Sequence, residues 1–138
     1  MAKLLSNAKL IEGFRIDVDD GRAHALCLDL EPDAGTDMGP SALELCIMSH
    51  AGCYAIIFVW TANKMRISLR DLKVKVEAII SEEIGTVTQE KFDIIVKADA
   101  PKDRIQRIHD VTLRNCPVGK LFEKAGVKIS YNLRIESE

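Results

Sequence analysis

Alternating apolar and polar residues predict strands on both sides of one long apolar segment. The predicted strands cover residues 9–17, 22–30, 71–80, 91–98 and 127–135. Side chains of a strand point alternately to its two faces, so this period of two is typical of half-buried strands. The sequences Asp19-Asp20-Gly21 and Glu82-Glu83-Ile84-Gly85 supply glycines for turns after the first and third of these strands.

Residues 42–62 predict a helix that is apolar on every side. Ser41-Ala-Leu-Glu44 before it fits a capping box, in which the serine oxygen and the glutamate each bind a free backbone N–H at the helix start. A helix that is apolar all round must be buried in a protein or a membrane. About 20 residues suffice to cross a bilayer, but Glu44 and His50 lie inside this segment. We therefore expect a soluble core helix.

Two shorter helices are predicted before the last strand. The first begins near Pro101, and the second follows Asn115-Cys116-Pro117 and ends near Gly126. The order of elements predicts a single α+β domain over residues 1–138, because strands come mostly as hairpins. One sheet covers only one side of the long helix, and we expect a second copy of the chain to cover the other.

Composition narrows the classes of partner and compartment. The formal net charge of −2, with both signs interspersed, gives no reason to expect nucleic acid, and no basic amphipathic segment indicates a membrane surface. The N-terminus lacks the pattern of a secretory signal, which favours the cytoplasm, where thiols stay reduced. The spacing of the four cysteines does not fit a zinc site, so we expect no metal.

The four cysteines differ in their surroundings. Cys27 and Cys46 are best explained as packing residues. Cys53 follows His50 by three residues on one helical face, where an imidazole can favour the thiolate. The alternative is a buried cysteine beside a histidine that only satisfies a hydrogen bond. Cys116 stands before Pro117 at the start of the last predicted helix.

A cysteine at a helix N-terminus is expected to have a lowered pKa, because the helix dipole and free N–H groups favour the thiolate. For Cys116 this holds if it is the N-cap. The alternative is that Asn115 is the cap and that Cys116 packs.

Three features together resemble the OsmC/Ohr family of osmotically inducible and organic hydroperoxide resistance proteins. They are GPSALELCIMSHAGCYAI around Cys53, NCPVGKL around Cys116, and the order of the predicted elements. The resemblance implies an OsmC-like, two-layer fold, with antiparallel strands wrapped around a long buried central helix in an intertwined homodimer.

The resemblance also implies a cysteine-dependent thiol peroxidase. Cys53 matches the family's peroxidatic cysteine, whose thiolate attacks the distal oxygen of an organic hydroperoxide and becomes a sulfenic acid. Cys116 matches the resolving cysteine, which forms a disulfide with it. An external dithiol or lipoyl-type reductant then restores both thiols, and no metal or other cofactor is needed.

Two further site residues are implied by the resemblance. Active relatives carry a glutamate ten residues before the peroxidatic cysteine, paired with an arginine from the N-terminal region. Here that position is Leu43, and the nearest carboxylate is Glu44. Arg15 is the first candidate for the arginine and Arg22 the second. The departure at Leu43 motivates two alternatives, a small-molecule or partner-binding protein without a peroxidase cycle and a thiol redox sensor.

Overall fold

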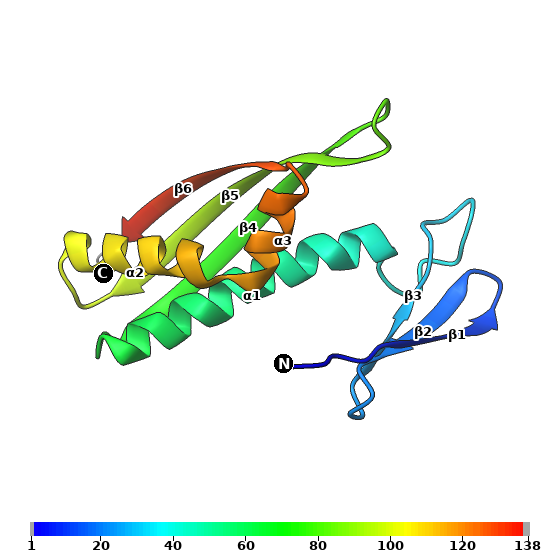
Figure 1. Cartoon of the computed structure of the whole chain (residues 1–138), viewed down its shortest axis with the longest axis horizontal. Coiled ribbons are helices and arrows are strands. Elements are labelled where there is room, and N and C mark those ends of the chain that lie inside the picture. The colour runs from blue at the N-terminus through cyan, green and yellow to red at the C-terminus, as the bar shows by residue number, and fades with distance from the viewer. Residues whose placement is uncertain (1, 137–138) are drawn as a thin grey trace. The chain divides into compact units, whose positions relative to one another are not determined.

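The computed structural model describes residues 2–136, which fold into two compact units that divide between Cys46 and Ile47. Below, these are the N-terminal and the C-terminal unit. The element order is β1 (Asn7–Glu12), β2 (Arg15–Asp19), β3 (Ala25–Leu28), α1 (Ala42–Lys64), β4 (Leu69–Ser81), β5 (Thr86–Ala98), α2 (Lys102–Asn115), α3 (Pro117–Lys124) and β6 (Lys128–Glu136). Figure 1 labels these elements along the chain. The prediction of an α+β fold is confirmed; the prediction of a single domain stays a prediction.

The N-terminal unit contains an antiparallel sheet in the order β1-β2-β3. The predicted first strand, residues 9–17, is wrong as one element, because the chain turns at Gly13 and pairs Leu10 with Ile16. Gly13 has a φ of +57°, a left-handed conformation that glycine adopts without steric cost. The interruption at Gly13 therefore marks a hairpin rather than an irregular strand.

Side-chain capping shapes the next two connections of this unit. Asp20 accepts hydrogen bonds from the backbone N–H groups of Arg22 and His24, and so orders the turn between β2 and β3. The predicted capping box is confirmed at the start of α1. The Ser41 N–H donates to Glu44 Oε1 over 2.9 Å, and the Glu44 N–H donates to Ser41 Oγ over 3.1 Å.

The C-terminal unit contains a sheet in the order β4-β5-β6. β4 and β5 form the predicted antiparallel hairpin, with Gly85 at φ +82° in its turn. β6 runs parallel to β5, which differs from the expected all-antiparallel arrangement. The reason lies in the connection, because α2 and α3 form a helical crossover, and parallel neighbours require one.

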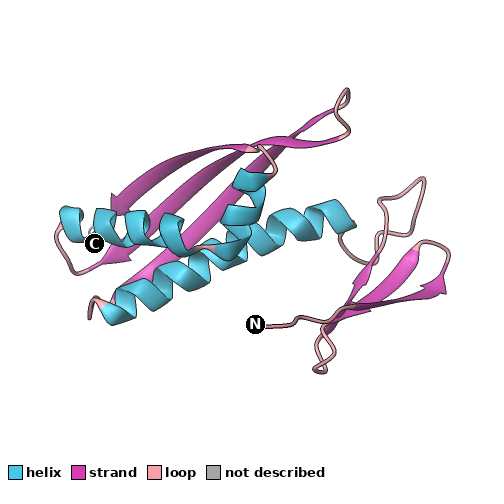
Figure 2. Ribbon diagram, viewed as in Figure 1, coloured by secondary structure: helices cyan, strands magenta, loops and turns pink. Residues whose placement is uncertain are grey.

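One face of this sheet packs against helices, as Figure 2 shows. The core cluster combines residues of α1, β5 and α2. Its large, fully buried members are Tyr54, Phe58, Phe92, Ile94, Ile105, Ile108 and Val96. The predicted stripe of α2 is confirmed in this core, since Ile105, Ile108 and Thr112 are buried.

Helix α1 is buried along one face and exposed along another. His50, Tyr54, Phe58, Thr61 and Ala62 are buried, whereas Met48, Ile56 and Trp60 are 54%, 67% and 57% exposed. Within one chain, the helix is therefore not enclosed on all sides as its sequence demands. Among the described residues it is the one helix long and apolar enough to cross a membrane, a test that core helices also pass. Within the described chain, 17% of its apolar window is buried.

Candidate dithiol site

Cys116 occupies the turn between α2 and α3 and is the N-cap of α3. Its backbone is extended, with φ −79° and ψ 106°, and its Sγ accepts a hydrogen bond from the Gly119 N–H over 3.4 Å. Pro117 fills the first helical position, where a missing N–H costs nothing. The structure thus settles the choice left by the sequence, since Cys116, and not Asn115, is the cap.

Cys53 lies on α1, and its side chain meets that of Cys116 at the start of α3. The two side chains form a hydrogen bond, although 63 positions separate them in the sequence. Both are free thiols, Cys53 half-buried and Cys116 buried. The structure therefore places a reduced, vicinal dithiol inside the C-terminal unit, with Cys53 as its more accessible member.

The pKa of Cys116 is raised to about 11, so the predicted lowering is wrong. Burial is the largest cause, because a thiolate loses its hydration inside the protein. The Gly119 N–H acts in the opposite direction but does not compensate, and the nearby Cys53 raises the pKa further. At neutral pH Cys116 is therefore a thiol.

His50 lies in the core with its ring almost fully buried. Its Nδ1 is 2.7 Å from Glu90 Oε1, and the rings of Phe92 and Phe122 contact it with centroids 4.7 and 4.6 Å away. The interpretation of His50 as a buried, hydrogen-bonded histidine is thus confirmed for its Nδ1. Its Nε2 faces Gly119, beside Cys116.

Glu90 is a site residue that the sequence analysis missed. It belongs to β5, at the position two before Phe92, and therefore faces the core together with Phe92, Ile94 and Val96. The predicted strand began at Lys91, which left Glu90 outside it. Extending the same alternation by one residue places this carboxylate on the face of the strand that points to the core.

A second buried histidine completes the polar part of this core. The Tyr54 hydroxyl and His109 Nδ1 are 2.6 Å apart, and Tyr131 packs against both rings. Burial lowers the pKa of His109 and raises that of Tyr54, so at neutral pH the imidazole is neutral and the phenol keeps its proton. Burial also raises the pKa of Tyr131 to about 12. His109 follows Ile105 by four residues, so the stripe of α2 already included its position.

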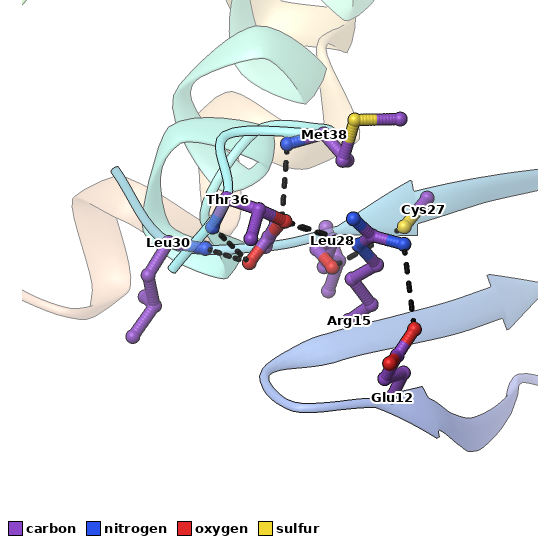
Figure 3. Close-up of polar contacts among 8 residues, drawn as sticks. Glu12, Arg15, Cys27, Leu28, Leu30, Thr36 and Met38 are labelled. Carbon is purple, nitrogen blue, oxygen red and sulfur yellow. Dashed lines mark hydrogen bonds and ion pairs between the residues drawn. The ribbon is translucent and has the colours of Figure 1, made fainter. Parts of the chain in front are cut away.

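Arg15 and Glu44 both lie in the N-terminal unit. Arg15 Nε donates to Thr36 Oγ1 over 3.0 Å and lies 3.9 Å from Asp29 Oδ2. Figure 3 shows Arg15 beside Thr36 and Glu12. Arg22, the second candidate, forms an exposed ion pair with Asp20. Glu44 is engaged in the capping box. The catalytic roles of Arg15 and Glu44 stay predictions.

Asp29 organises the loop between β3 and α1 and was also missed by the sequence analysis. Its carboxylate accepts hydrogen bonds from the Thr36 hydroxyl over 2.6 Å and from the backbone N–H groups of Leu30, Thr36 and Met38. These donors lower the pKa of Asp29 to about 2, the Thr36 hydroxyl most strongly. Figure 3 shows how they converge on one carboxylate.

The C-terminal unit also contains a hollow of about 510 Å³ along α1 and α2. Among its lining residues are Ile57, Trp60, Lys64 and Arg107, and neither cysteine of the dithiol lines it. No group of three or more potential metal ligands occurs among residues 2–136.

An α+β fold that brings a dithiol together from a long helix and a helix N-cap defines a class of thiol proteins. A family model described as OsmC-like protein matches residues 35–132, and the chain belongs to this family. No curated protein matches the chain.

Solved structures share the whole fold. An OsmC-like protein from Mycoplasma pneumoniae is 17% identical, with a TM-score of 0.87 over 97% of each chain. The organic hydroperoxide resistance protein OhrB of Bacillus subtilis is 18% identical, with a TM-score of 0.62 over 98% of each chain. An organic hydroperoxide resistance protein OsmC from Legionella pneumophila is 16% identical, with a TM-score of 0.67 over 97% of this chain and 98% of its own.

Proposed function

We propose that the protein is a cysteine-dependent thiol peroxidase that reduces organic hydroperoxides. The observation that carries the proposal is the contact between the free thiols of Cys53 and Cys116. Membership of the OsmC-like family and the overlap with two structures described as organic hydroperoxide resistance proteins support a redox role and this class of substrate.

Unequal burial supports the assignment of roles to the two cysteines. Cys53 is half-buried and within reach of a substrate, whereas Cys116 is 3% exposed. The Cys53 thiolate attacks the distal oxygen of the hydroperoxide, the O–O bond breaks, and an alcohol leaves after gaining a proton. Cys53 is then a sulfenic acid. Cys116 condenses with it to a disulfide and releases water, and an external dithiol or lipoyl-type reductant returns both thiols.

The exposed apolar surfaces support a homodimer. Met48, Ile56 and Trp60 form an uncovered apolar face of α1, and the N-terminal sheet exposes Leu10 and Phe14. Contiguous apolar surface of this kind is rare on a soluble monomer. A second copy of the chain can cover this surface, since most soluble oligomers are symmetric and consist of identical chains. We propose that the dimer works in the cytoplasm, where reduced thiols persist.

Serine substitutions of the two cysteines test the function. With cumene hydroperoxide and dithiothreitol, Cys53→Ser abolishes turnover, whereas Cys116→Ser still consumes one equivalent but does not recycle through the disulfide. Cys27→Ser is the matched control, because Cys27 lies in the N-terminal unit, and it leaves turnover unchanged. Undiminished hydroperoxide consumption by Cys53→Ser would overturn the proposal.

A thiol redox sensor is the second candidate, favoured by how Glu44 and Arg15 are engaged. Glu44 Oε1 accepts a hydrogen bond from the Ser41 N–H, and Arg15 Nε donates one to Thr36. Both charged groups are therefore already engaged in hydrogen bonds within the N-terminal unit. A sensor forms the same disulfide but turns over slowly. Stoichiometric disulfide formation without sustained turnover assigns this function instead.

A further inference from the structure

The proposed peroxidase cycle gives no task to a buried His–Glu pair beside the two cysteines. His50 Nδ1 and Glu90 Oε1 are 2.7 Å apart, and their side chains are 1% and 0% exposed. Burying two hydrogen-bonded polar side chains costs desolvation free energy, and apolar residues of similar volume often stabilise a core at least as well. Stability alone therefore does not explain why the core contains this pair.

The carboxylate of Glu90 is bound from one side. Its Oε2 is buried and has no hydrogen-bond partner among the described residues. A buried polar atom without a partner is costly, and such atoms concentrate at functional sites. Through Oε1, Glu90 fixes the orientation of the His50 ring, which Phe92 and Phe122 also contact.

The remaining ring nitrogen of His50 faces Cys116 across Gly119. A Cβ on Gly119 would lie 3.3 Å from His50 Nε2 and 3.5 Å from Cys116 Sγ, so both atoms border the same small space. Gly119 places no side chain there. The two atoms therefore lie within about 7 Å of each other, a span that one water molecule can bridge for proton transfer.

The proposed cycle requires proton transfer at this place. Attack on a sulfenic acid needs a thiolate, and the hydroxyl of the sulfenic acid leaves only after it gains a proton. Burial keeps Cys116 protonated, since its pKa is about 11. A group that removes the thiol proton and then delivers it to the leaving hydroxyl solves both problems.

We propose that His50, oriented by Glu90, is the acid–base catalyst of disulfide formation, an inference that rests on the proposed peroxidase function. His50 Nε2 takes the proton from Cys116, and the thiolate attacks the sulfur of the Cys53 sulfenic acid. As the S–S bond forms, the S–O bond breaks, and the imidazolium protonates the leaving hydroxide to water. The Cys53 sulfur is reduced by this step and the Cys116 sulfur is oxidised, so no further oxidant is needed. Glu90 is a positioning residue.

Other titratable groups surround this pair. They are Cys53 and Tyr54 on α1, His109 on α2 with Asp110 beside it, Cys116 and Glu123 on α3, and Tyr131 on β6. Burial keeps His109 neutral and both tyrosines protonated at neutral pH. His109 and both tyrosines therefore keep their charge between about pH 7 and 10 and do not contribute to a pH dependence there.

The central experiment separates sulfenic acid formation from its resolution. Each protein receives one equivalent of cumene hydroperoxide, dimedone is added to trap sulfenic acid, and mass spectrometry quantifies the adduct on Cys53. Cys116→Ser defines complete trapping. His50→Gln, which can still bond Glu90 but cannot carry the proton, forms the disulfide about 100-fold more slowly than the wild type and accumulates the adduct.

Matched variants distinguish catalysis from packing. His109→Gln alters the other buried histidine and resolves the sulfenic acid at the wild-type rate. Glu90→Gln keeps the shape and one hydrogen bond but loses the charge, and it slows resolution less than His50→Gln does.

The pH dependence of the resolution rate is a further test. A purely structural role of His50 would not change its shape, and the wild-type profile can be measured even if a variant fails to fold. The resolution rate of the wild type levels off well below pH 11, whereas that of His50→Gln rises about tenfold per pH unit as Cys116 ionises unaided. A wild-type rate that climbs steadily to pH 11, or equal rates in wild type and His50→Gln, would overturn the inference. Absence of any dimedone adduct on Cys116→Ser would overturn the peroxidase proposal instead.

Discussion

The C-terminal unit buries a continuous apolar cluster, whereas in residues 2–46 the one buried side chain is the carboxylate of Asp29. The C-terminal core joins Tyr54, Phe58 and Phe92 with the aliphatic side chains around them. In the N-terminal unit, strand β1 is exposed along its whole length. Hydrophobic burial therefore stabilises the C-terminal unit. Backbone pairing and the polar networks around Asp20 and Asp29 order the N-terminal unit.

This difference indicates which part of the fold a single chain can complete. A core cluster that is closed within one unit has its driving force in place without a partner. A three-stranded sheet with exposed Leu10 and Phe14 does not bury enough apolar surface for independent stability. We expect the N-terminal unit to owe more of its stability to the second copy than the C-terminal unit does.

The largest expected effect is on the C-terminal core. Phe92→Ala lowers its free energy of unfolding by about 4 kcal/mol, because it removes a fully buried ring and leaves a cavity. Trp60 and both tyrosines lie in the C-terminal unit, so intrinsic fluorescence during urea unfolding reports this unit selectively. Lys91→Ala, next to Phe92 but exposed, is the control and changes the value by less than about 0.5 kcal/mol. Equal effects of both variants would contradict the assignment of the core.

The buried His50–Glu90 pair gives the next largest effect. Glu90→Leu alone costs about 3 kcal/mol, because it leaves His50 without its partner in the core. The double variant His50→Leu/Glu90→Leu recovers most of that loss, since a packed apolar pair needs no desolvation. Urea unfolding monitored by fluorescence measures both. A double variant as unstable as the single one would show that the pair stabilises the fold, which would weaken the argument for a catalytic purpose.

The capping box tests the N-terminal unit on a smaller scale. Ser41→Ala lowers the free energy of unfolding by about 1 kcal/mol, because the N–H of Glu44 loses its acceptor. Hydrogen exchange of the first turn of α1 measures the effect locally. Glu44→Gln preserves the box, since glutamine also accepts the bond. Any tenfold loss of peroxidase activity in Glu44→Gln therefore assigns the carboxylate the catalytic role that the resemblance implies.

The two units should lose stability at different pH values, because different titratable groups are responsible in each. Burial lowers the pKa of His109 below its ordinary 6.5, so the unfolded chain binds this proton first and stability falls as pH falls below about 6.5. Asp29, with its pKa lowered from 3.8 to about 2, contributes stability that is lost only as pH falls from about 4 toward 2. Fluorescence should thus detect C-terminal weakening before hydrogen exchange detects loss of the Asp29 loop.

His109→Gln isolates the contribution of the histidine. This variant loses the stability change between about pH 6.5 and 5 but keeps the one near pH 3, which belongs to carboxylates. The corresponding variant Asp29→Asn does the reverse. If His109→Gln kept the full dependence above pH 5, another group would be responsible for it.

Several local features could be predicted because neighbours in sequence determine them. The Ser41–Glu44 capping box and the glycine turn at Gly85 each depend on contacts within three or four residues. The capping and turn preferences of such residues hold in most proteins. The family assignment rests on similarly local motifs around Cys53 and Cys116, and the match over residues 35–132 confirms it.

Other features depend on what packs from elsewhere in the chain. The hairpin at Gly13 required knowing that β1 and β2 pair, and the parallel direction of β6 required the crossover through α2 and α3. Glu90 follows the alternation of its strand, but only the fold shows that His50 meets it.

For the two cysteines the division is clear. The sequence by itself determined that Cys53 lies on a long apolar helix and that a short helix begins near Cys116 and Pro117, because helix periodicity and breaking residues are local. Only the tertiary structure decided that their side chains meet and that Cys116 is a poor acid. The N-terminus of a helix favours a thiolate, but burial removes water from the charge, and that loss exceeds what one backbone N–H returns.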